Sequence, residues 1–471
     1  MITFFIALAA LFLGYSIYGK FVEHVFGPDN RRTPALSKTD GVDYIPLPFW
    51  KIFMIQFLNI AGTGPIFGAI MGAKFGPSAY LWIVLGCIFA GATHDYLSGM
   101  LSLRNGGIGL PEIIGRYLGN RAKNTMLVFS VLLLVMVGAV FVYSPAIILG
   151  NMLGGVALWI GIIFVYYVIA TMMPIDRIIG KIYPLFAFAL LFMAFAMLVG
   201  LMVKMPQLPE IWEGIENRNP KMGPIFPILF ITIACGAISG FHATQSPLMA
   251  RCMKHERYGR PIFYGAMITE GMVALIWATV ASYFFYGGGA EELSAEVSAS
   301  APQIVTIVSE SWLGTLGGLL ALLGVVAAPI TSGDTALRSA RLIIADFIHL
   351  GQKTIRNRLY ICVPLFFITF LVLWFNIADE DGFNVIWNYF GWANQALSVF
   401  TLWAITVYLV KERKPFVITL IPALFMTVVC STFLLVSPIA FGLSETISYG
   451  IGGCILIVAS SWFYAWYRKN K

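Results

Sequence analysis

The chain has 471 residues, of which 59% are hydrophobic and only 11% are charged, and its mean hydropathy is +0.83. A soluble domain usually carries about 25% charged residues, so this composition excludes a water-soluble globular protein and indicates many membrane spans. The net charge of +7 is explained by the orientation of such a protein in the lipid bilayer, so no nucleic-acid partner is expected.

Thirteen apolar runs of about 17 or more residues are long enough to cross about 30 Å of hydrocarbon. In chain order they cover 2–18, 51–73, 78–100, 125–149, 154–172, 182–203, 225–248, 262–286, 312–345, 359–377, 384–410, 415–436 and 446–467. The first run lacks a basic segment before it, which favours an uncleaved span over a signal peptide. The sequence therefore predicts an all-α polytopic membrane protein with about 13 transmembrane helices.

Lysine and arginine are distributed very unequally between the two sets of alternate loops. One set holds 26 of the 30 basic residues, and the other holds only Lys74, Lys204, Arg218 and Lys221. Cytoplasmic loops carry the excess of basic residues in membrane proteins. We therefore predict that the N-terminus lies outside and the C-terminus inside.

Two of the predicted spans are interrupted by clustered glycines. Residues 59–65 read NIAGTGP, and residues 235–242 read CGAISGFH. Glycine pairs often allow close helix packing. Here, however, the two breaks lie five spans apart in spans of opposite direction, which is typical of a substrate site between two inverted repeats.

This reading divides the chain into two five-helix repeats with additional helices at each end. The predicted units are 1–50 (an extra N-terminal helix and a cytoplasmic loop), 51–203 (first repeat), 204–224 (extracellular loop), 225–410 (second, inverted repeat) and 411–471 (two C-terminal helices).

Helix ends at the two breaks provide the electrostatics of a binding site. The N-terminal ends of the half-helices suit a carboxylate, and the C-terminal ends suit a cation. The predicted substrate contacts are Gly62, Thr63, Gly64, Gly236, Ser239, Gly240, His242, Asn394 and Gln395. Two alternatives stay open: a buried, hydrogen-bonded role for the histidine, and an interhelical packing role for the two amides.

Ionisable residues inside the spans are costly and therefore candidates for ion coupling. Asp334 lies among hydroxyl side chains and is predicted to be functional. Asp95 is either an ion-coupling group or a structural partner of Arg104 or Arg338. Glu270 is predicted to be a structural partner or an inner-gate residue.

Other kinds of site find little support. The six cysteines lack regular spacing, so no disulfide or metal framework and no cofactor is expected. The sequence contains no Gly-x-Ser-x-Gly and no His-Glu-x-x-His, so an enzyme is not expected. A passive channel and a nutrient sensor for the same solutes remain the alternatives to a transporter.

Several stretches together resemble the carbon starvation protein A (CstA) family. They are 33–35 (TPA), 40–44 (DGVDY), 60–65 (IAGTGP), Asp95 with 102–106 (SLRNG), 239–242 (SGFH), 332–338 (SGDTALR) and 390–395 (FGWANQ). The similarity spans about residues 33 to 395, which is most of the chain.

The resemblance implies an inner-membrane uptake transporter for peptides or pyruvate, with amino acids a further possibility, driven by a gradient of H⁺ or Na⁺ through alternating access. The family is similar to the amino acid–polyamine–organocation superfamily, whose core is the LeuT-like five-plus-five inverted repeat. In sodium-dependent members the eighth core helix supplies a carbonyl and two hydroxyls, and Ala328, Thr331 and Ser332 have that spacing here. Oxygen ligands suit such a cation.

Two departures from the family pattern affect these expectations. Many relatives carry a His-His pair where this chain has Ile55 and Gln56, so a proton-coupling role of that pair is not carried over. The chain is also shorter than the long members, so functions of their extra C-terminal region are not expected of it.

Overall fold

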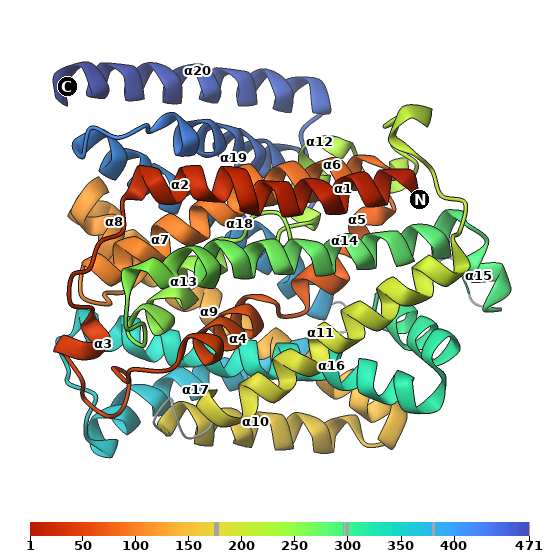
Figure 1. Ribbon diagram of the computed structural model, residues 1–471, viewed down its shortest axis with the longest axis horizontal. Helices are drawn as coiled ribbons and strands as arrows, with labels where there is room; N and C mark the ends of the chain where they lie inside the picture. The colour runs from red at the N-terminus through yellow and green to blue at the C-terminus, as the bar shows by residue number, and fades with distance from the viewer. Residues whose placement is uncertain (174–178, 295, 297–300, 379–381, 471) are drawn as a thin grey trace.

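The structure is a computed structural model that describes residues 1–173, 179–294, 296, 301–378 and 382–470. For 151, 152, 179, 180, 315–322, 376, 378, 382–385, 387 and 388 it describes the backbone alone. The described chain is helical, and most of its long helices lie side by side across the view of Figure 1.

Helices in the first half are α1 Ile2–Leu13, η1 Gly14–Tyr18, α2 Gly19–Phe26, α3 Pro34–Ser37, α4 Phe49–Ile60, η2 Gly64–Gly68, α5 Ala69–Ala73, α6 Ser78–Leu85, η3 Gly86–Gly91, α7 Ala92–Arg104, α8 Leu110–Leu118, α9 Asn120–Leu153, α10 Val156–Met172 and α11 Ile179–Lys204. Those in the second half are η4 Ile211–Glu213, η5 Pro220–Met222, α12 Ile225–Thr232, α13 Gly240–Ala250, η6 Glu256–Tyr258, η7 Arg260–Tyr264, α14 Gly265–Tyr286, α15 Gly289–Glu292, α16 Ala301–Phe347, α17 Ile355–Ala378, α18 Gly382–Lys411, α19 Val417–Val436 and α20 Glu445–Asn470.

Nine helical stretches of the described chain are long and apolar enough to cross a membrane, and the bent pair of α4 with residues 64–73 makes ten. This is fewer than the thirteen spans that hydropathy predicts. The difference lies in α10, which has 17 residues, in the interrupted pair α12 and α13, and in α16, part of whose side chains are outside the described set.

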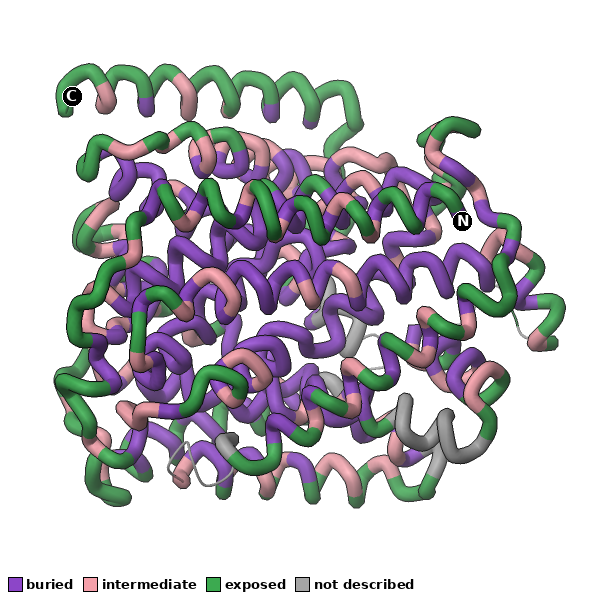
Figure 2. The backbone as a smooth tube through the Cα atoms, in the orientation of Figure 1, coloured by how far each residue is buried: buried purple, intermediate pink, exposed green. Residues whose placement is uncertain are grey.

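Burial follows the position of each helix in the bundle. Figure 2 shows mostly buried backbone at the centre and a largely exposed α20 at one edge. The outer helices expose large apolar side chains, such as Phe188, Trp374 and Trp462. Apolar side chains on the outside are stable only against lipid, so these faces are the ones that contact the bilayer.

Buried hydroxyls compensate for prolines inside the long helices. Pro145 in α9 has no N–H, so the carbonyl of Phe141, four residues earlier, loses its helical partner. The hydroxyl of Tyr167 on α10 donates to that carbonyl at 2.9 Å and to the carbonyl of Pro329 on α16 at 3.1 Å. One side chain therefore ties three helices together beside the centre of the protein.

Candidate functional site

The first break is a sharp bend in a fully buried helix. Helix α4 ends at Ile60, Ala61 leaves the helical conformation, and the chain resumes as a π-turn at Gly64 with a bend of 53°. Every residue from Ile55 to Ile70 is buried. Non-helical backbone at this depth is tolerated only where protein or a polar cavity satisfies its freed groups.

The second break separates α12 from α13 by seven residues, 233–239. Gly236 has φ = +92°, a left-handed conformation that a residue with a Cβ rarely adopts. Residues 233–250 are all buried. The indole nitrogen of Trp82 donates to the carbonyl of Ile233 at 2.9 Å, which satisfies one of the freed acceptors.

The two breaks pack directly against each other, although about 170 residues separate them in the chain. A Cβ added to Gly64 would lie 2.4 Å from both the Cβ and the Sγ of Cys235. A Cβ added to Gly68 would lie 2.9 Å from the carbonyl oxygen of Thr232. The glycines of the first break therefore allow close contact with the second break.

Two neighbouring amides of α18 hold the two sides of the second break. The Oδ1 of Asn394 accepts a hydrogen bond from the backbone N–H of Phe241 at 2.7 Å and one from the hydroxyl of Ser239 at 3.0 Å. The Nε2 of Gln395 donates to the carbonyl of Phe230 at 3.0 Å. The amides thus cap the start of α13 and the end of α12, so in this structure they make interhelical contacts of the kind that one of the two alternatives predicts.

Four titratable side chains form a fully buried acid–histidine network beside the second break: His94, Asp95, His242 and Glu270. Asp95 on α7 binds the Nδ1 of His94 and the Nδ1 of His242, each at 2.8 Å. The Nε2 of His242 lies 3.5 Å from Oε2 of Glu270 on α14. Neither this nitrogen nor either oxygen of Glu270 has a hydrogen bond of normal geometry.

This geometry fixes the histidine tautomer at Asp95. A carboxylate oxygen only accepts hydrogen bonds, so Nδ1 of His242 donates to it. The Nε2 lone pair then faces the Glu270 carboxylate, which is another acceptor. Two acceptors in a buried site require a proton or another cation between them.

The structure gives Asp95 different partners from those expected. Arg104 binds Glu256 and the carbonyl of Gly27, and Arg338 binds Asp43 and two backbone carbonyls, so the predicted pairing of Asp95 with either arginine is wrong. Both arginines lie farther along their helices toward the basic loops. The sequence feature that points to a histidine partner for Asp95 is its neighbour His94, because two adjacent polar residues in an apolar span indicate a buried polar cluster.

The residues predicted to hold a cation lie at the first break. The Ser332 hydroxyl donates to the carbonyl of Leu58 at 2.9 Å. The Thr331 hydroxyl donates to the carbonyls of Ala327 and Ala328, both at 2.9 Å. Only the Ser332 hydroxyl therefore contacts α4, at the carbonyl of Leu58, whereas the Thr331 hydroxyl bonds to the Ala328 carbonyl within α16.

Asp334 lies in a separate pocket between three helices. Its carboxylate accepts a 2.6 Å hydrogen bond from the Tyr183 hydroxyl and lies 3.5 Å from that of Thr171. The hydroxyl of Thr335 bonds back to its own helix. The expected hydroxyl environment exists, but α10 and α11 provide it, which the spacing within α16 did not reveal.

A row of buried polar side chains without partners leads along α4 to the first break. It consists of Gln56, Asn59 and Thr63, whose side-chain polar atoms have no hydrogen-bond partner in the described chain. Gln56 and Asn59 lie three positions apart on one side of α4, and Thr63 follows within the break itself. Unpartnered buried amides are costly, so they indicate a ligand or water site. Only the threonine was among the predicted contacts.

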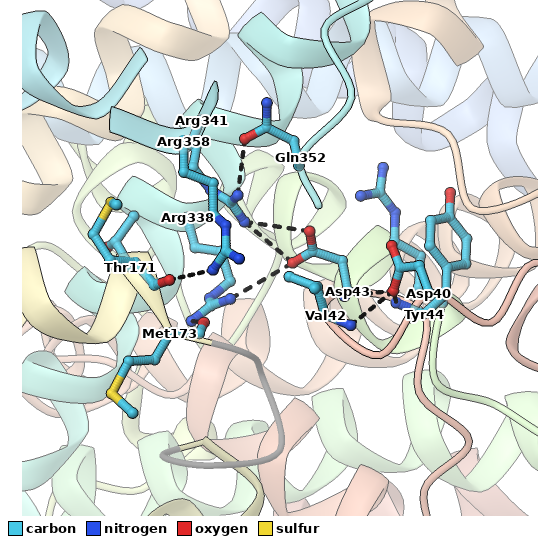
Figure 3. Close-up of polar contacts among 12 residues, drawn as sticks. Asp40, Val42, Asp43, Tyr44, Thr171, Met173, Arg338, Arg341, Gln352 and Arg358 are labelled. Carbon is cyan, nitrogen blue, oxygen red and sulfur yellow. Dashed lines mark hydrogen bonds and ion pairs between the residues drawn. The ribbon is translucent and has the colours of Figure 1, made fainter. Parts of the chain in front are cut away.

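A buried ionic cluster lies toward the C-terminal end of α16 (Figure 3). Asp43, from the loop before α4, lies 3.1 Å from an Nη of Arg341 and 3.5 Å from one of Arg338. Burial by itself raises the pKa of the Asp43 carboxyl, but Arg341 and Arg338 outweigh this effect and hold the pKa below its ordinary value. The cluster fastens the loop to α16.

Three residues of the described chain also offer the donor atoms of a metal site. The Sγ of Cys235, a ring nitrogen of His242 and a carboxylate oxygen of Glu270 all lie within 4.8 Å of one another, and all three residues are buried. Sulfur and imidazole nitrogen are ligands that transition metals prefer.

The described helices and the paired breaks define a helical membrane protein with two interrupted spans at its centre. A solved manganese transporter of Eremococcus coleocola matches with a TM-score of 0.61 over 92% of this chain and 99% of that chain, at 13% identity. A Na⁺-coupled sialic acid symporter matches with a TM-score of 0.54 over 97% and 95%, also at 13% identity. At such identities the likeness shows the fold alone.

The family profile described as "Carbon starvation protein CstA" matches residues 1–153, 143–315 and 282–433. The chain belongs to the carbon starvation protein CstA family. An uncharacterized membrane protein of Haemophilus influenzae is 45% identical over 60% of this chain and 91% of its own length. The peptide transporter CstA of Bacillus subtilis is 26% identical over 90% and 88%.

A further relative is the pyruvate/proton symporter BtsT of Escherichia coli, which is 27% identical over 54% of this chain and 44% of its own length. The named relatives are therefore transporters and not enzymes, and they confirm the resemblance seen in the sequence. The names cover two substrate classes, peptides and pyruvate.

Proposed function

We propose that the protein is a secondary active transporter that imports a small carboxylate or a peptide together with a proton. The observation that carries this proposal is the contact of the two helix breaks at Gly64 and Cys235, in a fully buried region with unpartnered polar side chains. Broken helices that meet at mid-membrane form the substrate site of many transporters. Relatives named as peptide and pyruvate transporters support the substrate class.

The proposed substrate site lies at the two breaks. Gln56, Asn59 and Thr63 offer amide and hydroxyl groups to a polar solute, and their buried atoms gain the hydrogen bonds they lack. The start of α13 offers its partial positive charge to a carboxylate. Asn394 caps this helix end in the occluded protein, and a substrate carboxylate would take over that contact.

The proposed coupling proton lies between His242 and Glu270. Their facing acceptor atoms, 3.5 Å apart, need one proton to coexist in a buried site. Asp95 holds the histidine ring in position. Because α7, α13 and α14 supply these three residues, a proton here joins the second break to two other helices.

The proposed architecture is the LeuT-like five-plus-five inverted repeat within about 13 spans, with the N-terminus outside and the C-terminus inside a bacterial-type cytoplasmic membrane. In this scheme α4 with α5, and α12 with α13, are the two broken helices. The repeat predicts alternating access by movement of one helix bundle around the fixed site.

The test is uptake by proteoliposomes that contain the purified protein, with labelled pyruvate and labelled dialanine as separate substrates. We expect accumulation of one of them under an imposed inward proton gradient, its loss with a protonophore, and saturable counterflow. Equilibration without accumulation or counterflow would identify a channel. Binding without any translocation would identify a sensor.

Variants separate the two coupling ions. His242→Gln should abolish proton-driven accumulation and retain counterflow, because the exchange of substrate does not require net proton movement. His255→Gln, in an exposed loop, is the matched control and should accumulate substrate normally. Accumulation that needs sodium, ignores the proton gradient and is lost in Thr331→Ala with Ser332→Ala would replace the proton with sodium at the first break.

A further inference from the structure

The second break and the helix beside it present a sulfur, a nitrogen and an oxygen ligand to one small volume. We propose that Cys235, His242 and Glu270 form a binding site for a divalent transition-metal ion of the Zn²⁺ class. Their donor atoms lie within 4.8 Å of one another, and each of the three side chains is at most 5% exposed. The Cys235 thiol faces the His242 ring, and the Nε2 of that ring faces Glu270.

The histidine is already oriented as a metal ligand. Its Nδ1 donates to Asp95 at 2.8 Å, which leaves the lone pair on Nε2, 3.5 Å from Oε2 of Glu270, available to a metal ion. A carboxylate that holds the far nitrogen of a ligating histidine is the usual second partner in zinc sites. Asp95 is thus a positioning residue for the metal and does not touch it.

The carboxylate is available for the same ion. Neither oxygen of Glu270 has a hydrogen bond of normal geometry, and the groups that face it are the His242 ring and the backbone of Gly236. A buried, unpartnered carboxylate beside a second one, Asp95, places negative charge around the position. A divalent cation compensates this charge more fully than a single proton does.

The donor set selects the class of metal. One sulfur, one imidazole nitrogen and one carboxylate oxygen suit Zn²⁺ or Co²⁺, whereas Na⁺, Mg²⁺ and Ca²⁺ prefer oxygen alone. Tetrahedral bonds of about 2.0–2.3 Å place ligand atoms about 3.3–3.8 Å apart. The donors therefore need to approach by about 1 Å, and the fourth position stays open for water or a carboxylate oxygen of the substrate.

Binding exchanges two protons for the metal. The S–H bond of Cys235 breaks and the proton between His242 Nε2 and Glu270 leaves, and both protons go to solvent. The thiolate, the Nε2 lone pair and a carboxylate oxygen of Glu270 then bind the ion. Binding itself does not depend on the proposed function. Its consequence does: an ion in this position occupies the acceptors that hold the coupling proton, so a bound metal stops proton-driven uptake.

The experiment uses the tag-free full chain in detergent, titrated with Co²⁺ and monitored by absorption. We expect a thiolate-to-cobalt charge-transfer band and the visible bands of tetrahedral cobalt, both lost on addition of Zn²⁺. The charge-transfer band should disappear in Cys235→Ser and persist in Cys430→Ser, the matched control, because that cysteine is buried on α19 away from the break. Asp95→Asn should weaken cobalt binding by about 10–100-fold.

Two results would overturn the site. One is a folded, monodisperse wild-type protein that binds no cobalt, and the other is a charge-transfer band that survives in Cys235→Ser. If that variant does not fold, X-ray absorption at the zinc edge of the wild-type protein decides, since a ligand shell without sulfur contradicts the proposal. Proton-driven uptake in a protein that binds no metal would remove this inference and leave the transporter proposal standing.

Discussion

Asn394 shows how one side chain can hold a helix break in a membrane protein. Its Oδ1 accepts hydrogen bonds from the Phe241 N–H and the Ser239 hydroxyl, and all three residues are buried. Because the site is buried, loss of this acceptor leaves both donors without a partner. The side chain therefore acts as a helix cap supplied by a neighbouring helix.

Replacing this cap is expected to destabilise the protein measurably. Asn394→Ala leaves two buried donors without an acceptor, which costs about 1–3 kcal/mol and lowers the thermal unfolding temperature. Asn394→Asp is the control, because it keeps the acceptor and places a negative charge at the start of α13. Equal unfolding temperatures for Asn394→Ala and the wild type would show that the cap does not contribute.

Individual residues were predictable where a polar group interrupts an apolar span. Such positions singled out His242, Asp95 and Asn394 as candidate site residues, and all three side chains are buried. Their partners were not predictable, because α7, α13 and α14 meet only through tertiary packing. His242 and Glu270 are 28 residues apart in the chain, so no helical spacing in the sequence indicates that they meet.

At the scale of elements, the two helix breaks depend on each other for close packing. Gly64 has an ordinary backbone φ, so a side chain is excluded at this position by the close neighbouring atoms and not by the backbone conformation. The atoms that fill this space belong to Cys235 on the other break. Sequence position alone predicted that the breaks would face one another, and the structure brings them into contact.

Enlarging this glycine should push the breaks apart. Gly64→Ala places a methyl group 2.4 Å from Cys235, an overlap that costs about 1–3 kcal/mol and should lower transport and thermal stability. Gly453→Ala on α20 is the control, because its added Cβ has no neighbour within 4 Å. The double variant Gly64→Ala with Cys235→Gly should recover part of the loss, and a failure to recover any would argue against this contact as the cause.

The loop before α4 and the end of α16 form another dependence between elements. Asp43 is 3% exposed and faces Arg341 and Arg338, neither of which is exposed (Figure 3). Asp43→Asn removes a charge from a buried group of ions, which costs about 3–5 kcal/mol. Thermal unfolding measures this loss, and Asp29→Asn, in an exposed pair, is the control, for which we expect little change in the unfolding temperature.

The same contact has a defined pH dependence. Because the pKa of Asp43 is lowered in the folded protein, its contribution is present above the ordinary carboxyl pKa of about 3.9 and is lost as the pH falls through the lower folded value. The difference in unfolding temperature between the wild type and Asp43→Asn should stay constant from about pH 8 to pH 5 and shrink below about pH 4. A difference that grows in acid would contradict this origin.

For the whole molecule, hydropathy and glycine pattern were enough to predict the helical class and the position of both breaks. They were not enough for the number of spans, because α10 is short and α12 is only eight residues long. Buried spans such as α7 also carry many polar residues, which lowers their apparent hydropathy. Contacts between loops at each end of the bundle are therefore a better guide than hydropathy to which loops share a side of the membrane.

Ion pairs between loops join loops of the same set, as the sets are defined by their lysine and arginine content. At one end Arg104 binds Glu256, and at the other Lys204 binds Glu292. The N-terminus lies on the side of α15, and the C-terminus lies at the opposite end of the bundle (Figure 1). Termini at opposite ends of the bundle are what the predicted odd number of spans would produce.

Reporter fusions test this orientation. Alkaline phosphatase fused after Gly214 should be active, because the loop from 204 to 224 is predicted to be outside, and the same enzyme fused after Arg413 should be inactive. Green fluorescent protein at the second position is the reciprocal control and should fluoresce. Activity of both phosphatase fusions would mean that an even number of spans separates the two positions, whereas this topology requires the five spans from α12 to α18 to place them on opposite sides of the membrane.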